Sequence, residues 1–247
     1  MNRCIPRNNR QVSTFLWLFC CFLLLIFSLG LSWQVNKSVN FFYGFWYTQL
    51  NIEQTIKTYV PQNTHGKQDF ANTGIQQHLN SFNQIVDEIH NNGKKLDKLS
   101  YINKENEHRL LLTTAEIVHL QDVAKLINQL GLLSIINFLL LLITIGGGYH
   151  FKQYKPLKKE RYIVVLIPSI ILLIMFSIFG FTEIFYYLHT VVFPDNHQWF
   201  FYYQESLMSS LMKAPDLFAA IGLSLIVIAC FIYLIIYRLL MTKLFRE

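Results

Sequence analysis

Two histidines, His119 and His189, are the residues of this chain best suited to acid–base chemistry. An imidazole has an unperturbed pKa of about 6.5, so it can accept or donate a proton near neutral pH. Asp122 follows His119 at a spacing that puts both side chains on one helix face, and its carboxylate is expected to orient the ring. His189 stands in an otherwise aromatic stretch, shortly before His197. The alternative is that each histidine has only a structural role.

Other catalytic signatures are missing from the sequence. It contains no GxSxG nucleophile elbow, no HExxH motif and no glycine-rich phosphate loop. None of the cysteines falls in a predicted external segment, which leaves no external thiol nucleophile or disulfide; they are Cys4, Cys20, Cys21 and Cys230. A zinc site built from His119, His189 and His197 has no local ligand spacing to support it. We therefore predict neither a metal nor a cofactor.

Four long apolar runs must position these residues. Each approaches the roughly 20 residues that a helix needs to cross a hydrocarbon core. They cover residues 14–33, 132–149, 162–182 and 217–237. The first run is longer than the apolar part of a usual signal peptide, so we expect an uncleaved anchor. The sequence therefore predicts an all-α membrane bundle of four transmembrane helices.

The positive charge is concentrated beside these runs. Eleven of the 21 Lys and Arg residues lie in three short segments, which the positive-inside rule places in the cytoplasm: residues 1–13, 150–161 and 238–247. The remaining segments, 34–131 and 183–216, are then external and are predicted to form a small, mainly helical extracellular cap. Because topology explains the net charge of +6, we do not expect nucleic acid as a partner.

Local patterns predict the elements of this cap. Ile75–Asn91 has apolar residues at helical spacing, and Gly93 follows as a stop signal. Lys94–Arg109 is charged, with short apolar pieces that are compatible with a loop or short strands. Ser206–Met212 is expected to form a short helix.

Thr113 and Glu116 match a capping box, in which each side chain satisfies the other residue's backbone N–H. They should open a helix over about Ala115–Leu130, which leads into the second apolar run. The cap alone would account for Glu116, without any role in chemistry.

Aromatic residues are dense in both external segments. They can form a belt at the water–lipid boundary, or walls that confine a lipid substrate. The candidates for such walls are Phe41, Trp46, Phe185, Tyr187 and Trp199.

The two histidine segments resemble motifs of a known family. Residues 112–123, LTTAEIVHLQDV, resemble the FTxREIxHMxDV segment of the lipoprotein intramolecular transacylase (Lit) family, and residues 188–199, LHTVVFPDNHQW, resemble its FHxxFFxNDxW segment. Residues 207–218 are similar to a third motif, and the resemblance spans nearly the whole chain. This sequence departs from the pattern at Ala115, where the family has arginine, and in the spacing of Asp195 and Asn196 before Trp199.

The resemblance implies a reaction. An acyl chain moves from the sn-2 position of a diacylglyceryl-modified bacterial lipoprotein to the α-amino group of its N-terminal cysteine, which gives a lyso-form lipoprotein. The substrate and membrane lipid would be the partners, and no cofactor is needed because ester and amine belong to one molecule. The family implies a multi-pass protein of the bacterial cytoplasmic membrane, with its site on the outer face at the junction of cap and membrane. Neither the preferred lipoproteins nor an oligomeric partner can be read from the sequence.

The resemblance also assigns the site. His119 and His189 correspond to the family's catalytic pair, and we expect His119 to be the base and His189 the acid or oxyanion stabiliser. The expected supporting residues are Asp122, Glu116, Asp195 and Asn196. Two alternatives remain open: a non-catalytic membrane receptor or chaperone, and an esterase that releases fatty acid from the same scaffold.

Overall fold

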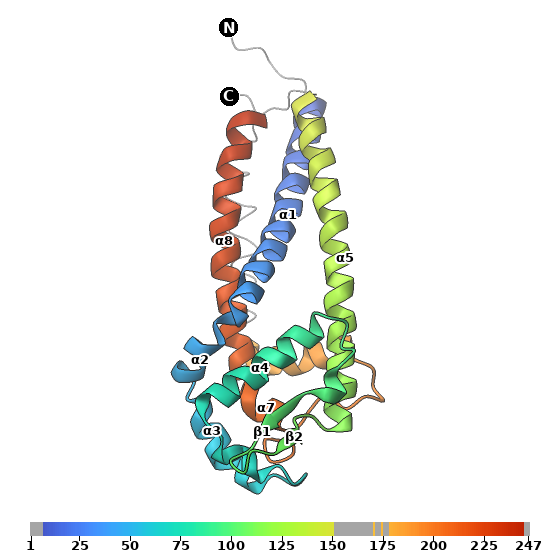
Figure 1. The fold of residues 1–247 in the computed structure, drawn as a ribbon. Helices are drawn as coiled ribbons and strands as arrows, with labels where there is room; N and C mark the ends of the chain where they lie inside the picture. The colour runs from blue at the N-terminus through green and yellow to red at the C-terminus, as the bar shows by residue number, and fades with distance from the viewer. Residues whose placement is uncertain (1–6, 151–169, 171–173, 175–177, 245–247) are drawn as a thin grey trace. The chain divides into compact units, whose positions relative to one another are not determined.

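The computed structural model describes residues 7–150, 170, 174 and 178–244 of the chain (Figure 1). Two compact units are present. One contains Met1–Gln34, Gly131–Gly180 and Leu225–Glu247, and the other contains Val35–Leu130 and Phe181–Ser224. Most of the predicted span 162–182, residues 151–161 of the predicted loop and Cys4 lie outside the described residues.

Long helices make up the first unit. In it α1 (Arg7–Ser38), the end of α5 (Thr114–His150) and α8 (Asp216–Leu244) run side by side (Figure 1). Their shared core includes Leu24 of α1 and Leu141 of α5, with Tyr233 and Tyr237 of α8 packed against it. Many large apolar side chains on these helices face outward, as expected where lipid rather than water surrounds a bundle.

Close approach and polar contacts join these helices. A Cβ added at Gly30 would come within 3.3 Å of the Ser134 hydroxyl, so α1 and α5 pack tightly there. Asn137 donates a 3.0 Å hydrogen bond to the carbonyl of Leu23, and Ser32 donates one of 2.8 Å to the carbonyl of Leu225.

Among the described residues, three helices are long and apolar enough to cross a membrane, and they lie over Gln11–Ser38, Thr114–Gly148 and Asp216–Leu240. A shorter apolar helix covers Ile178–Val192. In α5 the charged residues all precede Gly131, so the apolar stretch suited to lipid is the part after it. The protein is an all-α membrane protein, as predicted.

The second unit contains shorter elements. They are α2 (Tyr43–Gln49), α3 (Ile52–Tyr59), α4 (Ile75–Ile89), α7 (Leu207–Met212), the start of α5 and the Ile178–Val192 helix. Short 3-10 turns cover Asn40–Phe42, Val60–Gln62, Gln68–Asn72 and Leu96–Lys98. The predicted helices in Ile75–Asn91 and Ser206–Met212 are confirmed.

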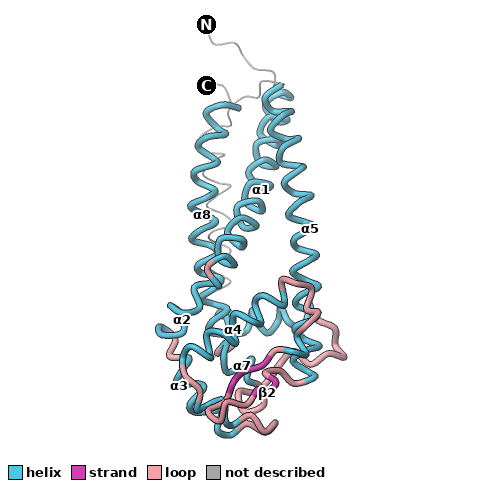
Figure 2. Tube along the Cα trace, in the orientation of Figure 1, coloured by secondary structure: helices cyan, strands magenta, loops and turns pink. Residues whose placement is uncertain are grey.

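A two-stranded antiparallel hairpin covers most of the Lys94–Arg109 region, for which the sequence left a loop or short strands open, and it extends to Leu110 (Figure 2). Its strands are β1 (Ser100–Ile102) and β2 (His108–Leu110). Tyr101 of β1 is fully buried, and its hydroxyl donates a 2.6 Å hydrogen bond to Asp69.

Gly93 ends the α4 region as the sequence predicted. Its φ is +66°, which an L side chain rarely adopts. Its N–H donates to the carbonyl of Glu88 at 2.8 Å, and an added Cβ would lie 3.0 Å from Leu96 and 3.4 Å from Ala124. The turn therefore needs glycine for its backbone angle and for the close contact with α5.

Aromatic stacking and a buried histidine hold α2 against α4. Tyr43 stacks on Phe82 with ring centroids 3.8 Å apart, and its hydroxyl donates to the carbonyl of Leu211 at 2.7 Å. His78 of α4 is 2% exposed, and its two ring nitrogens contact the hydroxyls of Tyr47 and Thr73 at 2.7 and 3.0 Å. This histidine is structural, because both of its ring nitrogens are satisfied inside the fold.

Candidate active site

Two helices of the second unit bring His119 and His189 together. His119 lies in the second turn of α5, and His189 lies near the end of the Ile178–Val192 helix. Their ring centroids are 6.1 Å apart and the ring planes differ by 30°. Residues 70 positions apart in the sequence therefore form one pair of imidazoles, as predicted.

A backbone hydrogen bond orients His189. Its Nδ1 lies 2.7 Å from the carbonyl oxygen of Phe185, one turn earlier on the same helix. A carbonyl can only accept, so Nδ1 carries the proton and Nε2 of the neutral ring keeps its lone pair. Burial lowers the pKa of His189, and the Phe185 carbonyl partly opposes this. His189 is therefore neutral at pH 7, with Nε2 able to accept a proton.

His119 is more deeply placed, with 8% of its surface exposed. Its pKa is lowered to about 4, mainly by burial and also by the charge of a protonated His189, while the Asp122 carboxylate opposes both effects. Neither of its ring nitrogens has a hydrogen-bond partner within the described part of the chain. Buried polar groups normally have hydrogen-bond partners inside the protein. Because His119 has none among the described residues, its ring nitrogens are available to a bound substrate.

Aromatic rings enclose the pair. Phe193 touches both histidines, with ring centroids 4.8 Å from His119 and 5.2 Å from His189. Phe185 and Trp199 lie 4.1 and 5.3 Å from His189. These rings make an apolar surrounding that suits an acyl chain and limits the access of water.

The predicted wall residues divide into two groups. Phe185 and Trp199 contact His189, as described above. The ring of Phe41 instead packs on that of His90, with centroids 6.1 Å apart, and the ring of Trp46 packs on that of Phe45, with centroids 4.8 Å apart. Tyr187 is 68% exposed. The ring contacts of the described residues do not link these three to either histidine.

Sequence reasoning missed two wall residues, Phe193 and Phe201. Phe201 is 9% exposed, and its ring centroid lies 6.0 Å from that of His119. Phe193 follows His189 by one helical turn, a spacing that could have marked it as a neighbour of the ring. No comparable signal points to Phe201, because an irregular segment carries it.

Asp122 does not make the contact that was predicted for it. One carboxylate oxygen pairs with Nδ1 of His197, and the other accepts a 2.9 Å hydrogen bond from Lys125. Both oxygens are thus engaged away from His119. The i, i+3 spacing brought Asp122 near His119, but the loop after Pro194 supplies a competing donor. Within the described residues no three His, Cys, Asp or Glu side chains gather in a way that could hold a metal ion.

Glu116 forms the predicted capping box and more. Its Oε2 accepts a 2.6 Å hydrogen bond from the Thr113 N–H, and the Glu116 N–H lies 3.4 Å from the Thr113 hydroxyl. Its Oε1 accepts from the Ser206 hydroxyl at 2.5 Å and from the Met208 N–H at 3.2 Å. This fully buried carboxylate therefore joins the start of α5 to the start of α7.

A buried lysine lies near the same carboxylate. Lys67 is 9% exposed and donates to the carbonyl of Leu111 at 2.8 Å. Burial lowers the pKa of Lys67, and the charge of Glu116 opposes that shift. The two remaining supporting candidates, Asp195 and Asn196, are both exposed, in a turn that the His197 N–H closes on the carbonyl of Pro194 at 3.0 Å.

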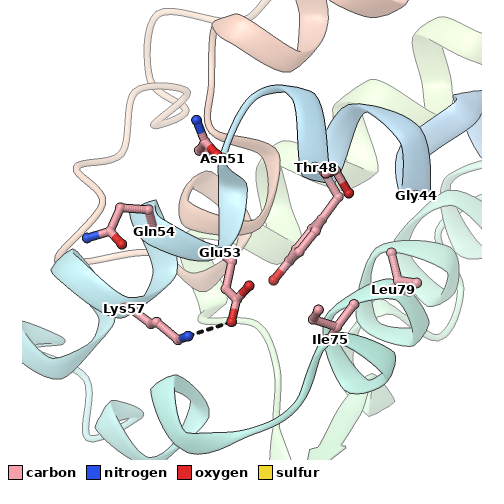
Figure 3. A pocket seen from close by; sticks show the side chains of 9 residues that line it. Gly44, Thr48, Asn51, Glu53, Gln54, Lys57, Ile75 and Leu79 are labelled. Carbon is pink, nitrogen blue, oxygen red and sulfur yellow. Dashed lines mark hydrogen bonds and ion pairs between the residues drawn. The ribbon is translucent and has the colours of Figure 1, made fainter.

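Two of the hollows on the described part of the second unit have the following linings. The larger, about 500 Å³, is lined by His65, Thr113, Thr114, Ala115, Gln198, Phe201 and Glu205. The smaller, about 330 Å³, lies between α2, α3 and α4 (Figure 3). Its charged groups, Glu53 and Lys57, pair with each other at 2.5 Å. Because that pair already satisfies both charges, we attach no chemistry to the smaller hollow.

Comparison with known proteins gives one family. The family model described as lipoprotein intramolecular transacylase Lit matches residues 16–214. No curated protein matches the chain. The fold is similar to a solved structure of the membrane integral lipoprotein intramolecular transacylase Lit from Bacillus cereus, determined for a histidine-to-arginine variant. The TM-score is 0.61 and the sequence identity is 14%, and the match covers 95% of this chain and 91% of that one. At this identity the structural likeness supports the fold, and the family model supports the activity. The chain belongs to the lipoprotein intramolecular transacylase family, and it is a membrane enzyme that transfers acyl groups on lipoproteins.

Proposed function

We propose that this enzyme moves the sn-2 acyl chain of a diacylglyceryl-modified lipoprotein to the α-amino group of its N-terminal cysteine, and that His119 and His189 carry the proton transfers. One observation supports this most strongly. Two neutral imidazoles lie in an aromatic environment with ring centroids 6.1 Å apart, and each has a nitrogen without a hydrogen-bond partner among the described residues.

The reaction requires one proton to leave and one to arrive. An α-amino group has a pKa of about 8 and must lose a proton as its nitrogen attacks the ester carbonyl. The carbon–nitrogen bond forms, the tetrahedral intermediate collapses, and the bond to the glyceryl oxygen breaks. That oxygen must then gain a proton. The net proton count is unchanged, so two histidines suffice.

The tautomer of His189 favours it as the base. Its Nδ1–H is held by the Phe185 carbonyl, so Nε2 presents a lone pair to the amine and can later return the proton to the glyceryl oxygen. This reverses our expectation from the sequence, in which His119 was the base. That expectation relied on Asp122 to orient His119, and Asp122 pairs with His197 instead.

His119 suits the second role. Its pKa of about 4 keeps the ring neutral at pH 7, so one ring nitrogen carries a hydrogen and can donate to the oxygen that becomes negative in the tetrahedral intermediate. Such a donor acts most strongly where water is excluded. The contacts of Phe193 and Phe201 with His119 provide that exclusion.

Holding the ester and the amine close together supplies a further part of the rate enhancement. Ester and amine belong to one substrate, and holding them together can contribute several kcal/mol. The aromatic lining also disfavours the esterase alternative, because hydrolysis needs a water molecule where the rings leave an apolar surface. Phe41, Trp46 and Tyr187 can contribute only to a more distant part of such a substrate site. Asp195 and Asn196, being exposed, can support the loop but not the reacting atoms.

We also propose the orientation. The clusters of Lys and Arg at both ends and in the loop 150–161 favour cytoplasmic termini, with the histidine pair on the outer side of the membrane. A lipoprotein whose lipid is anchored in the outer leaflet could then reach the pair.

Mass spectrometry of a diacylated test lipoprotein, incubated with the purified enzyme, tests the function directly. Transacylation gives an isomer of equal mass whose fragments carry an acyl chain on the cysteine nitrogen. A receptor or chaperone leaves the substrate unchanged, and an esterase gives a product lighter by one acyl chain. Either of these last two results would overturn the proposal.

A further inference from the structure

The 500 Å³ hollow has a lining unlike that of the aromatic site. Thr113 and the first turn of α5, with Thr114 and Ala115, form one side, and the 198–205 segment forms another. Its volume lies within the roughly 300–1,000 Å³ of sites that bind small molecules or short segments. We call it the polar cleft.

The polar cleft adjoins the histidine pair. Phe201 lines the cleft, and its ring centroid lies 6.0 Å from that of His119. Ala115 also lines the cleft, and it precedes His119 by one helical turn, so the two share a face of α5. A part of the substrate that extends from the reacting atoms past Phe201 therefore enters the cleft.

The lining offers hydrogen bonds that no acyl chain can use. The first turn of a helix has N–H groups without partners inside the helix, and Thr114 and Ala115 belong to that turn of α5. Threonine, histidine and glutamine side chains supply further donors and acceptors. Such a surface suits an extended polypeptide, whose backbone carries one donor and one acceptor for most residues.

Glu205 gives the cleft a charge. Its side chain is half-buried and has no hydrogen bond or ion pair with any residue that the structure describes. The other carboxylate in this region, Glu116, is already bound by Thr113, Ser206 and Met208. Glu205 is thus the carboxylate of the lining that remains available to a ligand.

We propose that the polar cleft binds the polypeptide immediately after the acylated cysteine, and that Glu205 favours a basic residue there. This rests on the proposed function, since that function places the α-amino group at the histidines. The substrate has two unlike parts around the reacting atoms. The acyl chains fit the aromatic rings, and the polypeptide needs the polar surface next to them.

The test compares two diacylated lipopeptides that differ only in the residue after the cysteine, Lys or Glu. The ratio of their kcat/KM values is measured by mass spectrometry of the N-acylated product. Wild type should prefer the Lys peptide by about two- to fivefold, the range for one partly exposed ion pair. Glu205→Gln should bring the ratio close to one, Glu205→Lys should reverse it, and high salt should weaken it.

Two further variants complete the experiment. Glu105→Gln, at an exposed position in the turn between β1 and β2, removes a carboxylate that does not line the cleft and should keep the wild-type ratio. Ala115→Leu adds bulk to the cleft and should raise KM for both lipopeptides while changing KM little for a diacylated cysteine amide that has no further residues.

The outcomes separate the two proposals. If wild type transacylates both lipopeptides but its ratio is one, or if Glu205→Gln keeps the preference, the cleft proposal is overturned and the proposed function stands. If wild type N-acylates neither lipopeptide nor the cysteine amide, the proposed function fails and the cleft proposal fails with it.

Discussion

Asp122 is three residues from His119 on α5, yet its carboxylate pairs with His197, 75 residues further along the chain. This pair ties the segment after the Ile178–Val192 helix to α5. That segment carries Trp199 and Phe201, the rings that contact His189 and His119. Hydrogen bonds with a charged partner contribute more than neutral ones. Asp122 and His197 are therefore expected to position the aromatic wall rather than to transfer a proton.

Removing this pair should slow the reaction without abolishing it. His197→Ala and Asp122→Asn should each lose about 1–2 kcal/mol of positioning, which lowers kcat about 5- to 30-fold. The double variant should be little worse than either single variant, because both remove the same contact. His197→Asn should recover part of the rate, because the Asn amide can donate from near the position of Nδ1. Steady-state kinetics with a diacylated lipopeptide measure all four.

Additive losses in the double variant would show that the two residues act separately. His108→Gln, on the exposed strand β2, serves as the control and should behave as wild type.

The lowered histidine pKa values predict how stability depends on pH. His119 has a pKa of about 4 in the folded protein, against about 6.5 in the unfolded chain. Between these values the unfolded chain binds the proton and the folded protein does not, so acidification from pH 6.5 towards 4 favours unfolding. His189, whose pKa is also lowered, acts in the same direction.

Thermal unfolding in detergent between pH 7 and pH 4.5 checks this. The melting temperature of wild type should fall more steeply with acid than that of His119→Gln, which has no imidazole to protonate. Parallel curves for the two proteins would mean that His119 is not held in its neutral form.

Glu116 should matter more for stability than the capping box alone requires. Thr113→Ala removes one cap contact and should cost about 1 kcal/mol. Glu116→Gln keeps the shape of the side chain but replaces one accepting oxygen by an NH₂ group. That group would face the Thr113 N–H or the Ser206 hydroxyl, both of which donate to Glu116. The negative charge near Lys67 is also lost. We expect Glu116→Gln to cost about 2–3 kcal/mol, the range for leaving a buried partner of a charged group unsatisfied.

Chemical unfolding of the two variants measures the difference. A loss for Glu116→Gln no larger than that for Thr113→Ala would show that the contacts to α7 contribute nothing. A stable Glu116→Gln protein without activity would instead indicate a role for Glu116 in the chemistry.

The proposed orientation predicts which positions can be labelled from outside the cell. In a cysteine-free variant, single cysteines at Glu105 and Asn196, both exposed positions, should react with an impermeant maleimide in intact cells. A cysteine at Gln153, in the loop predicted to be cytoplasmic, should react only after lysis. Labelling at Gln153 in intact cells would reverse the orientation.

Local chemistry allowed much of this structure to be predicted. The Gly93 stop, the Thr113–Glu116 capping box and the apolar helices follow from short-range rules, because neighbouring residues decide them. The His119–His189 pair was predicted from motifs, and α5 and the Ile178–Val192 helix bring it together.

Contacts between distant segments could not be predicted in the same way. The partner of Asp122 depends on where the loop around His197 lies, and the roles of Phe201 and Oε1 of Glu116 depend on how the 198–208 segment packs on α5. Spacing along one helix cannot supply that information. The sequence likewise predicted that Phe41 would line the substrate site, yet its ring packs on His90.

Transacylation by purified His119→Ala and His189→Ala proteins, with a diacylated lipopeptide at pH 7.5, tests the central claim most directly. Each variant should insert and unfold like wild type but lose at least ~10² in rate, the lower end for removing an acid–base group. The double variant should be little slower than either single variant, because the two rings act in one proton-transfer cycle. His108→Ala, at an exposed position on β2 outside both the histidine pair and the polar cleft, should keep wild-type turnover of the same lipopeptide. Near-normal turnover by either His119→Ala or His189→Ala would contradict the assignment and leave the pair with a structural role.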